Sequence, residues 1–153
     1  MCLCTLDKTP EPFEEGYKFF EVVDNKVYPP CNDEHHKHII PDEWMYSDDY
    51  GGALFIHNTT EFFTYPAGWH VYKTKEDALA SWFNNRNPNR YVLIKVKCGD
   101  MHTTGDGNPT GAFRKPWTFP PHNERPTVRV GVCAEIFVPK GAKDIRTEKT
   151  LFN

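Results

Sequence analysis

The segment that decides the fold is TVRVGVCAEIFVPKGA, Thr127 to Ala142, because it carries the longest β-type pattern in the chain. Apolar residues recur at every second position, and side chains two apart share one face of a strand. This face carries Val128, Val130, Val132, Ala134, Ile136 and Val138. The opposite face carries Arg129, Gly131, Cys133, Glu135 and Phe137. The segment therefore predicts a long closing strand with a carboxylate in its most apolar part.

Three further stretches predict the rest of the framework. Residues 90–98, RYVLIKVKC, alternate in the same way and predict a half-buried strand. Residues 17–30, YKFFEVVDNKVYPP, place Asp24 and Asn25 between two β-type runs, which predicts a hairpin. Residues 42–52, DEWMYSDDYGG, end in a glycine pair and predict a short turn or helical turn.

Residues 68–82, GWHVYKTKEDALASW, predict a strand followed by a helix. Thr74 can cap the free amides of the first helical turn, and acidic residues follow it at the positive end of the helix. Apolar residues then recur at spacings of three and four, and Pro88 cannot continue the helix. We therefore expect a helix over 75–84.

The expected architecture is α+β: one domain with a mostly antiparallel, bent sheet or split barrel and one clear helix. A chain of 153 residues fits one domain, and a 14% aromatic content with 13 prolines favours a β-rich fold with structured loops. We expect residues 1–16 to form an extended N-terminal arm and residues 17–153 the domain. Residues 99–126, rich in proline and glycine, are expected to form a long loop of the kind that often carries function.

Charge and composition narrow the classes of partner and compartment. The net charge of −3 and the scattered basic residues give no reason to expect a nucleic acid partner. The apolar stretches are too short for a membrane span, and the first residues lack the pattern of a secretory signal. The five cysteines follow no disulfide spacing, so free thiols in the cytoplasm are expected.

Glu135 and His70 are the first candidates for chemistry. Glu135 either faces solvent or lines a cleft in which its pKa would be shifted. Gly131 on the same predicted face would allow close approach of a ligand. His70 either bonds a backbone carbonyl, which braces the junction between strand and helix, or acts as a general acid or base.

A histidine-rich stretch, CNDEHHKH at 31–38, raises the alternative of a metal-binding protein. His36 and His38 share a side of an extended chain, and Cys31 or Asp33 would complete a ligand set. The paired spacing typical of zinc ligands is missing, so a solvated loop is the other interpretation. Cys2 and Cys4 fall on the expected arm and are interpreted as free thiols.

Several aromatic residues lie beside acidic or loop segments and are candidates for contacts. Buried, they would anchor loops; exposed, they would form a protein-contact surface or stack on a nucleotide base. They are Trp44, Tyr46, Tyr50, Trp117 and Phe119.

The order of the segments resembles the carboxyl-terminal part of ADP-ribosyltransferase domains. The resemblance rests on GWHVYKT, EDALASW, VLIKVKCGD and AEIFVPKGA. It implies that fold, NAD as cofactor, and Glu135 as the glutamate that holds the ribose hydroxyl and supports the oxocarbenium charge. His70 and Tyr72 would then join Glu135 as catalytic residues. The ligand-binding residues would be Tyr17, Lys18, Trp69, Arg129, Trp117 and Phe119.

The stretches YKFFEV, GWHVYKTKEDALASW and RYVLIKVKCGD are also similar to a family of small phage and bacterial domains without an assigned activity. This resemblance implies a small, phage-encoded accessory or inhibitory binding protein. We therefore expect a binding protein that engages a protein or a nucleotide-like ligand, through the 99–126 loop and nearby aromatic residues. The ADP-ribosyltransferase-like enzyme and the metal-binding protein are the alternatives.

Overall fold

The computed structural model describes residues 3–30, 37–50, 54–58, 62–81, 84, 89–107 and 127–152. The strands are β1 (Glu15–Val23), β2 (Lys26–Tyr28), β3 (Trp44–Tyr46), β4 (Phe55–Asn58), β5 (Phe63–Pro66), β6 (Trp69–Tyr72), β7 (Tyr91–Gly107) and β8 (Val128–Phe137). The helices are the 3-10 helix η1 (Ser47–Tyr50) and the α-helix α1 (Lys75–Leu79).

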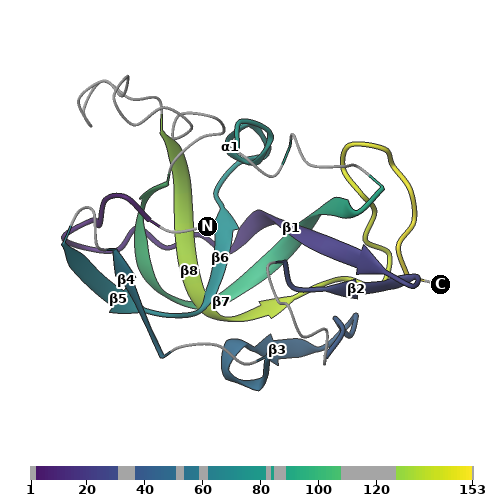
Figure 1. Ribbon diagram of the computed structural model, residues 1–153, viewed down its shortest axis with the longest axis horizontal. Coiled ribbons are helices and arrows are strands. Elements are labelled where there is room, and N and C mark those ends of the chain that lie inside the picture. Colours follow the sequence, from purple (N-terminus) through teal and green to yellow (C-terminus); the bar gives the residue numbers. More distant parts are fainter. Residues whose placement is uncertain are drawn as a thin grey trace.

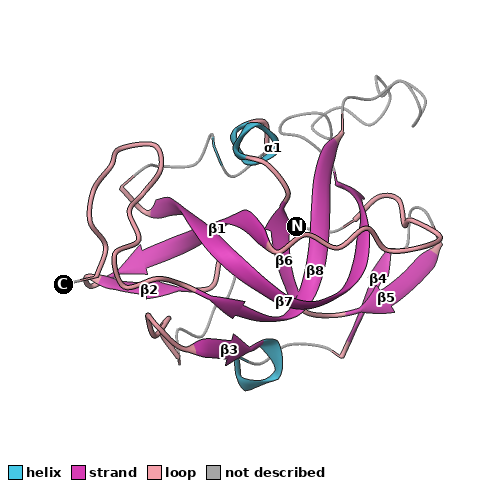
Figure 2. Cartoon of the chain, turned by 180° about the vertical axis from the view of Figure 1, so that it is seen from behind, coloured by secondary structure: helices cyan, strands magenta, loops and turns pink. Residues whose placement is uncertain are grey.

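The strand pairings close into a ring. β1 pairs with β6 and β7, and β8 pairs with the same two strands, all of them antiparallel (Figure 1). β2 extends the sheet from β1, β3 extends it from β8, and β4 and β5 form a separate two-stranded sheet. Figure 2 shows the same arrangement from behind, with α1 and β3 at opposite ends of the molecule. The prediction of a mostly antiparallel sheet with one α-helix is confirmed for the described residues.

The predicted hairpin is confirmed between β1 and β2. Asp24 and Asn25 have φ angles of 51° and 63°. Positive φ at both central residues is the requirement of the two-residue turn whose twist matches the flanking strands. The local sequence was sufficient here because Asn and Asp tolerate this left-handed conformation better than other side chains do.

The sheet is buried on both sides over much of its area. Phe20, Val71 and Ile94 belong to one core cluster, whereas Phe19 and Leu93 belong to another. Consecutive residues of one strand therefore belong to different core clusters, so both faces of the strand are buried. The prediction of a half-buried strand over 90–98 is therefore wrong for its first part, because residues 91–94 are all buried and exposure begins with the lysines at 95 and 97.

The prediction of a loop over 99–126 is also wrong for residues 99–107. These residues continue β7 and pair with β8 from Gly99 opposite Glu135 to Gly107 opposite Val128. Glycine, aspartate and threonine in this stretch obscured the strand pattern, but the pairing with an apolar neighbour overrides local propensity. The rest of the predicted loop, residues 108–126, lies outside the described residues.

Helix α1 is shorter than predicted, ending at Leu79 rather than at residue 84. Its start is as expected: the Thr74 hydroxyl accepts from the Asp77 amide at 3.1 Å, and the Asp77 carboxylate accepts from the Thr74 amide. This reciprocal capping satisfies two amides that have no partner within the helix. Trp82 and Phe83 lie outside the described residues.

Residues 3–7 lie along the end of β7. The amides of Cys4 and Thr5 donate to the Asp106 carbonyl at 2.7 and 3.2 Å, and the Asp7 amide donates to the Thr104 carbonyl at 3.0 Å. Leu3 is fully buried among side chains of the ring. We call residues 3–14 the N-terminal segment.

Candidate functional site

His70 lies in a chain of buried hydrogen bonds. Its Nε2 is 2.9 Å from the Tyr65 hydroxyl, and its Nδ1 is 3.3 Å from the Gly68 carbonyl. The Leu3 amide donates to the Tyr65 hydroxyl at 3.0 Å. Because a carbonyl can only accept, Nδ1 carries the proton and Nε2 accepts from Tyr65 in a neutral imidazole. The bond to a backbone carbonyl is the one that the structural interpretation of His70 predicted.

Burial strongly lowers the pKa of His70, to about 3, and the nearby positive charge of Lys18 lowers it further. The hydrogen bond to Gly68 opposes this shift, and His102 adds to it. The side chain therefore stays neutral at physiological pH. A neutral, buried and fully bonded imidazole stabilises the fold around β6.

Tyr72 and Tyr17 lie opposite each other on β6 and β1. Tyr72 is buried, and its ring meets that of Phe19 edge to face with centroids 6.4 Å apart. Tyr17 is half-buried and packs against the same cluster. Both residues therefore contribute to packing between the ring strands.

Lys18 and Trp69 also lie inside the protein. Lys18 is buried and donates to the His70 carbonyl at 2.8 Å, with its ammonium 5.8 Å from the Trp69 ring centroid. The Trp69 indole donates to the Met45 carbonyl at 3.0 Å. These contacts bind β1, β6 and β3 to one another, and they leave little of either side chain for a ligand.

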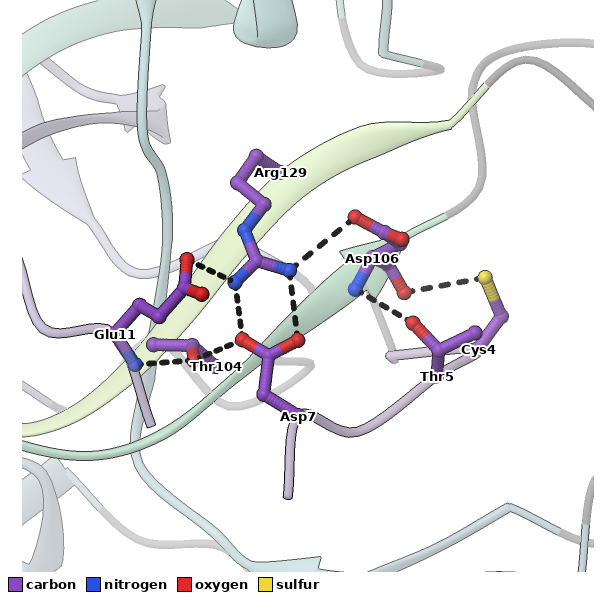
Figure 3. Close-up of polar contacts among 7 residues, drawn as sticks. All are labelled: Cys4, Thr5, Asp7, Glu11, Thr104, Asp106 and Arg129. Carbon is purple, nitrogen blue, oxygen red and sulfur yellow. Dashed lines mark hydrogen bonds and ion pairs between the residues drawn. The ribbon is translucent and has the colours of Figure 1, made fainter. Parts of the chain in front are cut away.

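Arg129 binds the N-terminal segment. Its guanidinium pairs with both carboxylate oxygens of Asp7, with Glu11 at 3.2 Å and with Asp106 at 3.4 Å (Figure 3). The hydrogen bond from Arg129 holds the pKa of Asp7 below its usual value, although burial opposes this. A guanidinium shared among three carboxylates fixes the segment to β7 and β8.

Glu135 lies apart from His70 and Tyr72, the other two catalytic candidates. It pairs with Tyr46 on β3 and with Gly99 on β7. His70 pairs with Val132, three residues along β8, which corresponds to about 10 Å of strand. Glu135 contacts Tyr46, whereas His70 bonds Tyr65 and Gly68. The structure therefore brings His70 and Tyr72 together on β6 but does not bring Glu135 into contact with them.

Several predicted site residues lie outside the described residues. These are Trp117, Phe119, Cys2, Cys31, Asp33 and His36. His38 is described, and its Nδ1 is 3.1 Å from the Ile39 carbonyl. Within the described ranges, no three His, Cys, Asp or Glu side chains are grouped to hold a metal ion. Cys98 and Cys133 are free thiols, and the Cys4 thiol donates to the Asp106 carbonyl at 3.1 Å.

The most exposed aromatic side chains on the main sheet lie on β3. Trp44 and Tyr46 are 46% and 55% exposed, and Met45 between them is buried. Trp44 lies opposite Phe137 on β8 with ring centroids 5.6 Å apart, and Tyr46 lies opposite Glu135. We call Trp44, Tyr46, Glu135 and Phe137 the aromatic surface. The predicted short turn or helical turn over 42–52 is confirmed for η1, but residues 44–46 are a strand, because pairing with β8 holds them extended.

Exposed acidic residues flank β3 in the sequence, at 43, 48 and 49. The negative charge of Glu135 and its hydrogen bond with the hydroxyl raise the pKa of Tyr46, and Asp49 adds to the effect. Burial raises the pKa of Tyr50, with smaller contributions from Asp49 and Glu43. The sequence contained a signal for this surface, since EWMYSDD alternates aromatic and apolar residues between acids. The pairing of β3 with Glu135 and Phe137 could not be predicted from it.

A second exposed apolar area lies on the β4–β5 sheet. Leu54, Phe55 and Phe62 are 78%, 51% and 91% exposed. Residues 59–61, which join the two strands, lie outside the described residues. The described residues of this area, 54–58 and 62–66, include no Asp, Glu, Lys or Arg, so they offer less electrostatic specificity than the aromatic surface does.

Comparison with protein-family models, curated proteins and solved structures gives no significant match. The resemblances to ADP-ribosyltransferases and to small phage domains therefore gain no support from known proteins. Among the described residues, no helix has the length and apolar character needed to cross a bilayer.

Proposed function

We propose that this chain is a small binding protein that contacts a protein partner through the aromatic surface. The observation that carries the proposal is the exposure of Trp44 and Tyr46 on a strand at the end of the sheet order. Tryptophan and tyrosine are the residues most enriched among those that dominate binding energy in protein interfaces. Their rigid rings bury a large area for a small loss of side-chain entropy.

The surroundings favour a protein over a nucleotide-like ligand. Glu135 lies within the aromatic surface, and Glu43, Asp48 and Asp49 are exposed beside it. Carboxylates in these positions repel the phosphate groups that a nucleotide carries. The aromatic surface therefore supports protein contacts better than base stacking.

The enzyme alternative has weaker support because its candidate residues are separated. A transferase site needs the glutamate and its supporting groups within reach of one reacting centre. Glu135 is beside Tyr46, whereas His70 and Tyr72 are buried in the contacts described above. A phage origin and an inhibitory role stay predictions from sequence resemblance.

The proposal predicts that the double variant Trp44→Ala/Tyr46→Ala loses its protein partner. Each ring is expected to contribute about 2 kcal/mol to binding, so the pair should lower affinity by at least about 100-fold. The measurement is capture from a cell lysate on immobilised protein, followed by a titration of the captured protein with each variant.

Phe55→Ala provides the matched control, since Phe55 is 51% exposed but lies on β4, in the separate two-stranded sheet. The control should capture the same protein as the unsubstituted chain. Thermal unfolding of all variants checks that the fold is intact. Undiminished capture by the folded double variant would contradict the proposal, as would loss of capture by Phe55→Ala alone.

A further inference from the structure

We infer that the aromatic surface takes a basic segment of its partner, with arginine side chains lying against the Trp44 and Tyr46 rings and pairing with Glu135. This inference rests on the proposed function and specifies the partner's chemistry. It is carried by the combination of exposed aromatic side chains, a carboxylate placed between β3 and β7, and acidic residues on either side of β3 in the sequence.

The charge balance of the region is negative. Glu135 lies within the aromatic surface, and the negative charge of Asp49 also acts on Tyr46. Glu43 and Asp48 are exposed residues that flank β3 in the sequence. Lys37 and Lys97 also lie in this region, but the ammonium group of each lies over an aromatic ring of this chain. A cationic segment therefore gains Coulomb energy here, whereas an anionic one loses it.

These two lysines show that aromatic rings of this region accept cations. The Lys97 ammonium lies 5.4 Å from the Phe137 ring centroid, and the Lys37 ammonium lies 4.7 Å from that of Tyr50. Both distances are within the range of attractive cation–π contacts. Trp44 and Tyr46 are the exposed rings beside them, and tryptophan offers the strongest cation–π face.

Glu135 is held where it can receive a guanidinium. Tyr46 lies opposite it on β3, and Gly99 lies opposite it on β7. A Cβ atom at Gly99 would approach the Glu135 Cγ and Oε1 atoms to 2.6 Å. The missing side chain thus leaves the space in which the carboxylate lies. Arginine suits this site better than lysine because its planar fork can stack on a ring and bond a carboxylate at once.

The test is an amide-resolved NMR titration of the full chain with defined nine-residue glycine–serine peptides. One peptide contains three arginines, and the others replace them with citrulline, lysine or glutamate. The arginine peptide should shift the amides of residues 43–49 and 135–137, and bind at least about 10-fold more tightly than its neutral citrulline counterpart. Its affinity should fall as salt is raised, because the contacts are solvent-exposed.

Three substitutions test whether the Glu135 carboxylate binds the arginine peptide. Glu135→Gln should weaken binding of the arginine peptide about 3- to 10-fold, whereas Glu76→Gln, an exposed glutamate on α1, should leave it unchanged. Gly99→Ala should resemble Glu135→Gln, because it displaces the carboxylate while leaving both rings in place.

Equal affinity for the arginine and citrulline peptides would overturn the inference, and so would shifts confined to β4 and β5. Binding of a single-stranded oligonucleotide at residues 43–49 would also overturn it. If the Trp44→Ala/Tyr46→Ala variant loses its lysate partner but no peptide shows a preference for positive charge, the proposed function stands and the basic partner is wrong. If the lysate partner is retained, the proposed function itself fails.

Discussion

Replacing Gly105 with alanine is expected to detach the N-terminal segment and lower the free energy of unfolding by about 2–4 kcal/mol. A Cβ atom at this position would lie 2.0 Å from the Thr5 carbonyl oxygen and 2.9 Å from its carbon. Both are backbone atoms, so a side-chain rotation cannot relieve the clash. The segment must move, which exposes Leu3 and separates Asp7 from Arg129.

Chemical denaturation measures the loss, and amide hydrogen exchange locates it. Exchange at Cys4, Thr5 and Asp7 should accelerate, because their amides bond the Asp106 and Thr104 carbonyls in the intact protein. Gly141→Ala is the matched control, since a Cβ there meets no atom within 4 Å. Native stability and unchanged protection in the Gly105→Ala variant would show that the segment does not dock as described.

Acidification is expected to destabilise the protein through His70. The folded-state pKa is about 3 and the ordinary value is 6.5, so the unfolded chain binds the proton more tightly. Stability from this group is complete above pH 6.5 and is lost progressively as the pH falls toward 3. Between pH 7 and pH 4 the free energy of unfolding should fall by about 3 kcal/mol from His70 alone.

The variant His70→Gln isolates this contribution, because glutamine keeps hydrogen-bonding groups but does not titrate. Asp7 also makes the protein less stable in acid, because its pKa is lowered in the folded state. The unsubstituted protein therefore has more than one source of pH dependence. The variant should be less stable at pH 7 but show a smaller decrease between pH 7 and pH 4. An identical decrease in both proteins would mean that His70 is not buried in its neutral form.

The sequence predicted one turn and the start of the α-helix, because each depends on the chemistry of a few neighbouring residues. Asp24 and Asn25 specify a turn by their tolerance of positive φ, and Thr74 specifies a helix start by capping. The second half of β7 could not be predicted in this way. Its residues form a strand because β8, more than twenty residues further on, supplies the partner. Pairing over such a distance leaves no local signal.

The sequence identified individual residues of the candidate site but could not predict which of them lie together. The sequence identified Trp44, Tyr46 and Glu135 separately, but the register of β3 against β8 makes them one surface. Arg129 was predicted to bind a ligand, and its actual partners include Asp7 from the beginning of the chain. A half-buried arginine with carboxylate partners and an arginine that awaits a ligand have the same local sequence pattern. Only the folded chain distinguishes them.

Hydrogen exchange of the protein bound to its captured partner tests the proposed contact surface most directly. If the aromatic surface is the interface, exchange should slow at residues 43–50 and 135–137, while α1 at the opposite end of the molecule is unaffected. Slowed exchange confined to residues 54–58 and 62–66, with 43–50 unchanged, would place the interface on β4 and β5 and contradict the account.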